Sequence, residues 1–123
     1  MPSARTTAVL TWVAQLVAAA ILGMAATSKL TGASDAIALF TLLGVEPWGR
    51  LTLGSAELGT ALLLLWPRTA LLGGFLGTTL MLGAIATHLF RIGISYGGDP
   101  SLFLTACLVL AASVVTILLR RRP

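Results

Sequence analysis

Charged side chains and thiols are scarce in this chain of 123 residues. Charged residues make up 10% of it, whereas a soluble domain carries about 25%. Hydrophobic residues make up 57%, and the mean hydropathy is +0.98. Too few polar side chains remain to cover a surface that faces water. The composition therefore predicts a single domain, residues 1–123, whose main partner is the lipid bilayer.

The scarcity of cysteine and histidine argues against several kinds of functional site. Cys107 is the only cysteine and makes neither an internal disulfide nor a CxxC pair. His88 is the only histidine, so no recognisable metal site and no paired haem ligands are expected. The glycines do not form a phosphate-binding loop. We expect no metal and no intrinsic cofactor.

The excess of positive charge is small and unevenly placed. The net charge is +4 and the pI is about 10.7. Three of the eight basic residues form the terminal run Arg120–Arg122, and the others are scattered singly. No basic stripe with interleaved aromatic residues is present, so we expect no nucleic-acid partner. The charge is better interpreted as a membrane-topology signal.

Four apolar stretches predict the fold. They cover about residues 8–29, 48–66, 69–90 and 100–119. Each has the roughly 20 residues that cross a hydrocarbon core of about 30 Å as a helix. Ala and Leu dominate over β-branched residues, and no alternation of period two appears, which argues against strands. The sequence predicts an all-α integral membrane protein, a four-helix bundle.

The connections between these stretches agree with a bundle. Pro67-Arg68 leaves almost no loop and predicts a tight antiparallel hairpin. Asp99-Pro100 is typical of a helix start. In the longer first loop, Ser34 or Asp35 can begin a short helix that Gly44 ends. That helix is too short to span, so we expect it at the membrane interface or folded back over the bundle.

Basic residues near the helix ends predict the orientation. With both termini in the cytoplasm, five lie on the inner side and three on the outer side, which satisfies the positive-inside rule. The inner residues are Arg5, Arg68, Arg120, Arg121 and Arg122, and the outer ones are Lys29, Arg50 and Arg91. A cleavable signal peptide is the competing interpretation of the first stretch. The apolar run of this stretch exceeds the roughly 7–15 residues usual for the apolar region of a signal peptide, so we expect the stretch to be retained.

Glu57 is the leading candidate for a functional residue. It lies near the middle of the second stretch, and an acid at bilayer depth is costly and commonly marks a site or a proton path. Gly54 and Ala61 share its helix face by their spacing of three and four residues. A face of small residues lets helices approach closely, so we expect Glu57 to point into the bundle. A role limited to packing is the alternative.

Lys29 and His88 are the candidate partners of Glu57. Each of these two residues lies at the outer end of an apolar stretch. Side chains lean toward the start of their own helix, so Lys29 and His88 both lean into the membrane. Glu57 leans toward them from the opposite direction, and a Lys29–Glu57 ion pair would offset part of the burial cost. Each also has an ordinary interpretation, Lys29 as an interfacial anchor and His88 as a packed bundle residue. Arg91 is a secondary candidate that we expect among the headgroups.

The order of these segments resembles the DoxX-like family of small bacterial membrane proteins. The segments are GMAATSKLTG, LFTLLGVEPWGR, LGSAELGTALLLLWPR and GAIATHLFRIG. Family members typically have a lysine at the end of the first helix and a glutamate in the second, the places of Lys29 and Glu57. The resemblance implies a four-helix bundle in the bacterial cytoplasmic (inner) membrane. It also implies an association with membrane redox complexes, since the family takes its name from a subunit of a thiosulfate:quinone oxidoreductase.

Three functions are compatible with these features. The first is a quinone-associated or accessory subunit of a membrane redox complex, with other subunits as partners. The second is a small proton-coupled transporter that uses the intramembrane glutamate. The third is a structural assembly partner in which the polar residues only hold the helices together. The small-residue faces also allow a homo-oligomer.

Overall fold

The computed structural model describes residues 3–121, and these form helices and connecting loops. Helix bounds follow the predicted stretches closely, and Arg122 lies outside the described residues. The elements are α1 (Ala4–Leu30), α2 (Ser34–Leu42), α3 (Trp48–Leu64), α4 (Ala70–Thr87), its continuation η1 (His88–Ile92) and α5 (Ser101–Arg120). The expected all-α membrane bundle is confirmed.

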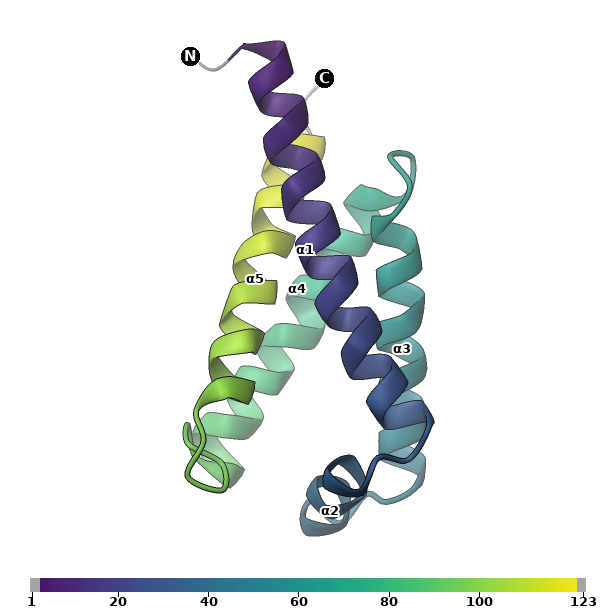
Figure 1. The fold of residues 1–123 in the computed structure, drawn as a ribbon, viewed down its shortest axis with the longest axis vertical. Coiled ribbons are helices and arrows are strands. Elements are labelled where there is room, and N and C mark those ends of the chain that lie inside the picture. Colours follow the sequence, from purple (N-terminus) through teal and green to yellow (C-terminus); the bar gives the residue numbers. More distant parts are fainter. Residues whose placement is uncertain (1–2, 122–123) are drawn as a thin grey trace.

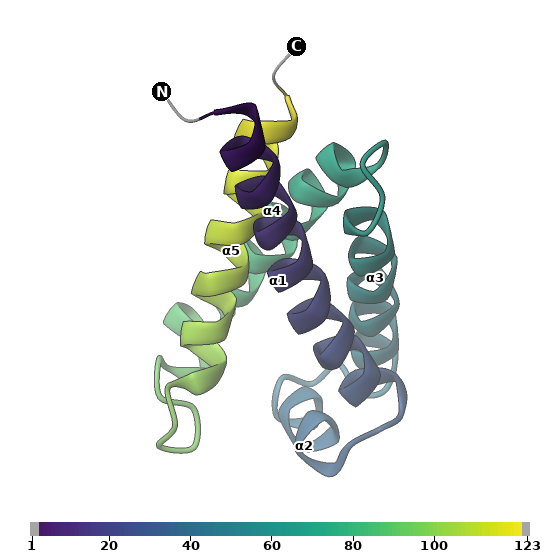
Figure 2. The same ribbon diagram turned by 45° about the horizontal axis from the view of Figure 1, so that its top comes forward.

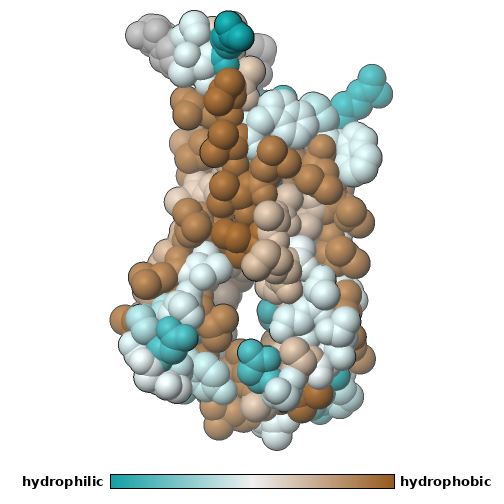
Figure 3. All heavy atoms as spheres, in the orientation of Figure 1, coloured by the Kyte–Doolittle hydropathy of each residue, from teal (hydrophilic) through white to brown (hydrophobic). Residues whose placement is uncertain are grey.

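Three helical segments are long and apolar enough to cross a membrane. They are α1, the continuous segment Ala70–Ile92, and α5. Helix α3, predicted as the fourth span, has 17 residues, which is at the short end of the range for a spanning helix. Hydrophobic side chains dominate the middle of the molecule, and hydrophilic ones gather toward the two ends (Figure 3). This distribution suits a protein surrounded by lipid.

The long helices are arranged as two antiparallel pairs. Helix α1 packs along α3, and α4 packs along α5, while contacts of α1 with α5 and of α3 with α4 join the pairs. Both termini lie at one end of the bundle and α2 at the other (Figures 1 and 2). The pairs are close together near the termini and diverge toward α2 (Figure 1). The bundle therefore has a closed end, near the termini, and an open end, near α2.

Small residues and one buried amide close the bundle near the termini. A Cβ atom added at Gly73 would lie 2.9 Å from Leu64 Cγ, and one at Gly77 would lie 2.5 Å from Ser113 Oγ. The two glycines, four residues apart on α4, thus form a helix-packing surface. Gln15 is fully buried and donates from Nε2 to the Leu64 carbonyl at 2.8 Å, which ties α1 to the end of α3.

Helix α2 is the short helix expected in the first loop. The Asp35 carboxylate accepts a hydrogen bond from the Ala36 backbone amide at 3.1 Å, and Gly44 adopts the positive φ of +77° that ends such a helix. Phe40 is buried, and α2 packs against α1 and α3. The helix therefore folds back over the open end of the bundle (Figure 2).

The loop that joins the second pair shapes the opposite side of the open end. Helix α4 continues as the wider turn η1, and Gly93 ends this turn with a φ of +84°. Pro100 is the N-cap residue of α5, and Asp99, one residue earlier, accepts a hydrogen bond from the Ser101 backbone amide at 2.9 Å. Wider helical turns of this kind are frequent at functional sites, and η1 begins at His88.

Candidate functional site

A cavity of about 510 Å³ lies between the two helix pairs at the open end. Residues from α1, α2, α3, α4, η1 and α5 line it, and most of them are aliphatic, such as Leu22, Leu53 and Val109. The molecule is hollowed between the lower halves of α1 and α5, where the pairs diverge (Figure 3). Pale and hydrophilic residues border this hollow on both sides, toward the open end (Figure 3).

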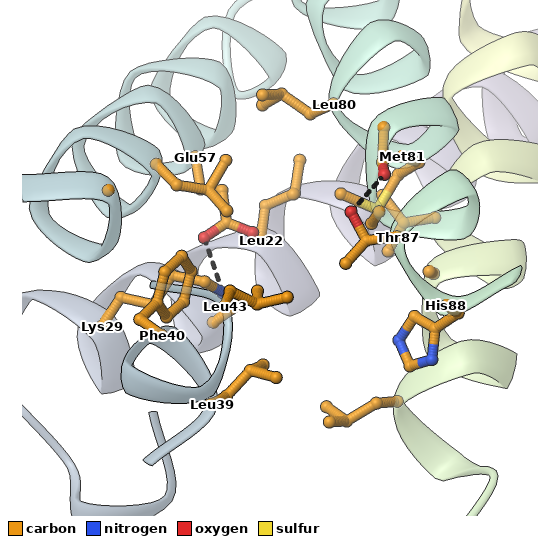
Figure 4. A pocket seen from close by; sticks show the side chains of 18 of the residues that line it. Leu22, Lys29, Leu39, Phe40, Leu43, Glu57, Leu80, Met81, Thr87 and His88 are labelled. Atoms are coloured by element: carbon orange, nitrogen blue, oxygen red, sulfur yellow. Dashed lines mark hydrogen bonds and ion pairs between the residues drawn. The ribbon is translucent and has the colours of Figure 1, made fainter. Parts of the chain in front are cut away.

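The Lys29–Glu57 ion pair forms one wall of the cavity. Lys29 Nζ lies 2.9 Å from Glu57 Oε1, and the two side chains are 17% and 5% exposed (Figure 4). Gly54 makes the contact possible, because a Cβ atom there would lie only 3.0 Å from Lys29 Cβ. The predicted pair between the end of α1 and the middle of α3 is thus present. Glu57 points into the bundle, as its burial cost requires.

The ion pair does not satisfy the hydrogen-bonding capacity of the carboxylate. No described residue donates a well-aligned hydrogen bond to Glu57 Oε1, although this atom is buried. Buried polar atoms nearly always have such a partner. Glu57 lines the cavity, so its carboxylate group lies beside any molecule bound there.

Arg50 holds the end of α1 from behind the ion pair. Its side chain is buried, and its Nε lies 2.9 Å from both carboxylate oxygens of Glu46. Its Nη1 donates a hydrogen bond to the Lys29 backbone carbonyl. Sequence reasoning assigned Arg50 only to the count of outer basic residues. Glu46 lies four residues before Arg50, in the turn that leads into α3, and this nearby acid was the signal that could have found the contact.

His88 lies on the opposite wall of the cavity, away from the ion pair. The ring is buried, contacts the edge of Phe103 with centroids 5.6 Å apart, and faces the cavity (Figure 4). Its Nδ1 is 3.0 Å from the Gly93 carbonyl oxygen. A carbonyl oxygen only accepts, so Nδ1 carries the hydrogen, and Nε2 of the neutral ring is left as an acceptor.

The expected convergence of three groups is therefore partial. Lys29 and Glu57 touch, whereas His88 shares their cavity without contacting either. Arg91, the secondary candidate, is exposed and does not line the cavity. Within residues 3–121, no three His, Cys, Asp or Glu side chains lie close enough together to hold a metal ion.

The model of the DoxX-like family matches residues 13–119. The chain belongs to the DoxX-like family. The matched region extends from α1 to the last turn of α5, so the DoxX-like part of the chain includes both walls of the cavity. Searches of curated proteins and of solved structures find no match. Membership of the DoxX-like family does not by itself specify a function.

Proposed function

We propose that this chain binds a membrane quinone in the cavity and works as a quinone-associated or accessory subunit of a membrane redox complex. One observation carries the proposal: a mostly apolar cavity has polar groups on two facing walls. Its volume of about 510 Å³ falls within the roughly 300–1,000 Å³ of small-molecule sites. A quinone has the matching chemistry, since it combines an apolar ring and tail with two carbonyl oxygens.

The residues of the two walls have complementary roles toward such a ligand. The Lys29 ammonium group can donate a hydrogen bond to a carbonyl oxygen, and the Glu57 carboxylate and His88 Nε2 can accept one from a hydroxyl group. The bound quinone supplies the two-electron chemistry, with electrons exchanged through a redox partner subunit. Glu57 and His88 hold or relay the accompanying protons at the named atoms.

The lining of the cavity also favours a lipophilic ligand. Most of the lining residues are aliphatic, such as Leu22, Leu53 and Val109. An apolar ring and tail that leave the bilayer for this lining exchange one apolar environment for another. A water-soluble substrate would have to be desolvated first.

We further propose that the chain crosses the cytoplasmic (inner) membrane with both termini inside. The two termini lie at the same end of the bundle (Figures 1 and 2). Arg5, Arg120 and Arg121 belong to that end, as does Arg68 in the connection between α3 and α4. An excess of basic residues on one side is the usual mark of the cytoplasmic face.

Quinone binding by the purified protein tests the proposal. We expect Glu57→Gln to weaken the binding of a quinone analogue at least about tenfold, because a charge-assisted interaction in the cavity is lost. Asp35→Asn is the matched control, since it also removes one carboxylate but lies on the exposed side of α2. Equal affinity of Glu57→Gln and the unmodified protein in a titration would remove Glu57 from the site.

A transporter is the second candidate, because the bundle is closed at one end and open at the other. Gln15 joins α1 to α3 and α5 at the closed end, while Glu57 lies in the cavity at the open end. A carrier that faces one side of the membrane has this form. Substrate-driven proton flux into liposomes that is absent in Glu57→Gln would favour this function over the first.

A further inference from the structure

The closed end of the bundle carries positive charge that no acid balances. The four acidic residues of the chain are Asp35, Glu46, Glu57 and Asp99. They belong to α2, the connection that follows it, α3 and the loop before α5, all in the half of the molecule toward the open end or at mid-depth. The arginines at the closed end are Arg5, Arg68, Arg120 and Arg121. Among residues 3–121, therefore, no carboxylate neutralises this end.

Arg120 differs from the other arginines because it is held in place. Its Nε donates a hydrogen bond to Gln15 Oε1 at 2.6 Å, and Gln15 is itself fully buried and bonded to the Leu64 carbonyl. The guanidinium carbon lies 5.5 Å from the centre of the Trp12 ring. Contacts with α1 thus fix the direction of a side chain from α5, whereas Arg68 and Arg121 are exposed.

The anchoring leaves the phosphate-binding part of Arg120 unused. Only Nε has a hydrogen-bond partner, and the two terminal amino groups have none among the described residues. A planar guanidinium with free terminal donors suits a phosphate group, which it can bind through two parallel hydrogen bonds. Trp12 beside it is a residue type that favours the level of lipid headgroups.

We propose that Arg120, positioned by Gln15 and Trp12, binds the phosphate of an anionic phospholipid at the closed end of the bundle. A net negative lipid is favoured over a zwitterionic one for a physical reason. The neighbouring arginines attract negative charge, and no described carboxylate at this end can receive the cationic part of a zwitterionic headgroup. This site is separate from the cavity, and the inference does not depend on the proposed function.

Lipid binding to the full-length purified protein tests this site. Native mass spectrometry in mixed micelles measures the retention of phosphatidylglycerol and of phosphatidylcholine, and inorganic phosphate is added as a competitor. We expect retention of phosphatidylglycerol over phosphatidylcholine that free phosphate does not reverse. Arg120→Lys keeps the charge but loses the anchored fork, so it should lower the retention of phosphatidylglycerol about tenfold.

Arg121→Lys is the matched control, and we expect it to keep the retention of the unmodified protein. If charge alone retained the lipid, both lysine variants would retain it as well as the unmodified protein does. Equal retention by Arg120→Lys and the unmodified protein would therefore overturn the proposal. Displacement by inorganic phosphate would also overturn it, in favour of a free-phosphate site. If Arg120→Lys lowers the melting temperature without lipid, Trp12→Leu provides the test, because Trp12 is only half-buried and its loss removes the ring that positions an unchanged Arg120. The same tenfold loss is expected, and undiminished retention would contradict the proposal.

Discussion

Lys29→Met is expected to lower the free energy of unfolding by about 3 kcal/mol, because it leaves the Glu57 carboxylate buried without its cation. The Glu57 side chain is 5% exposed and has no other ionic partner among the residues that the structure describes. Glu57→Gln should cost less. The Lys29 side chain is 17% exposed and ends a helix, so its ammonium group can move toward the headgroups.

The double variant Lys29→Met/Glu57→Gln should be more stable than Lys29→Met alone, because no unpaired charge is left in the bundle. Reversible unfolding in mixed micelles measures all three variants against the unmodified protein. Lys29→Met combined with Asp35→Asn serves as the control, and its two effects should add to within about 0.5 kcal/mol. Additive losses for Lys29 and Glu57 would show that the ion pair contributes no coupling energy.

Gly83→Leu is expected to abolish quinone binding while the protein stays folded. Gly83 lines the cavity, and a Cβ atom added there meets no atom within 4 Å. The new side chain can therefore occupy the cavity or its opening without displacing the helices. Replacing a glycine inside a helix also stabilises it by up to about 1 kcal/mol, so a loss of binding cannot be attributed to unfolding.

Gly59→Leu provides the comparison for this variant. Gly59 also lies within a helix and has open space around its Cβ position, but it does not line the cavity. We expect the melting temperature of both variants to equal or exceed that of the unmodified protein, and only Gly83→Leu to lose binding in a quinone titration. Normal binding by Gly83→Leu would place the ligand outside the cavity.

The burial cost of charge made part of the site predictable from sequence. An acid in the middle of an apolar stretch must face other helices and meet a cation, and Lys29 was the candidate at the right depth. The apolar stretches likewise predict the long helices, because backbone N–H and C=O groups within the hydrocarbon must hydrogen-bond to one another. Both predictions rest on the large free-energy cost of placing unpaired polar groups in hydrocarbon, which few arrangements of the chain avoid.

The remaining features depend on how helices pack, which the pattern of single residues does not encode. The divergence of the two pairs follows from close contacts at one end, such as Gly77 against Ser113, and from their absence at the other. It separates His88 from Glu57, although both lean toward the same depth. An amide is ordinary in a membrane helix, so the sequence gives no reason to single out Gln15. Only the structure shows that it joins three helices.

A photoreactive quinone analogue tests the central claim most directly. After illumination of membranes that contain the full chain, mass spectrometry locates the labelled residues. The cavity predicts labels on the residues of segments 21–29 and 79–88 that line it, and the loss of these labels when excess unlabelled quinone is present. Labels spread over the lipid-facing sides of the closed end, unaffected by competition, would contradict it.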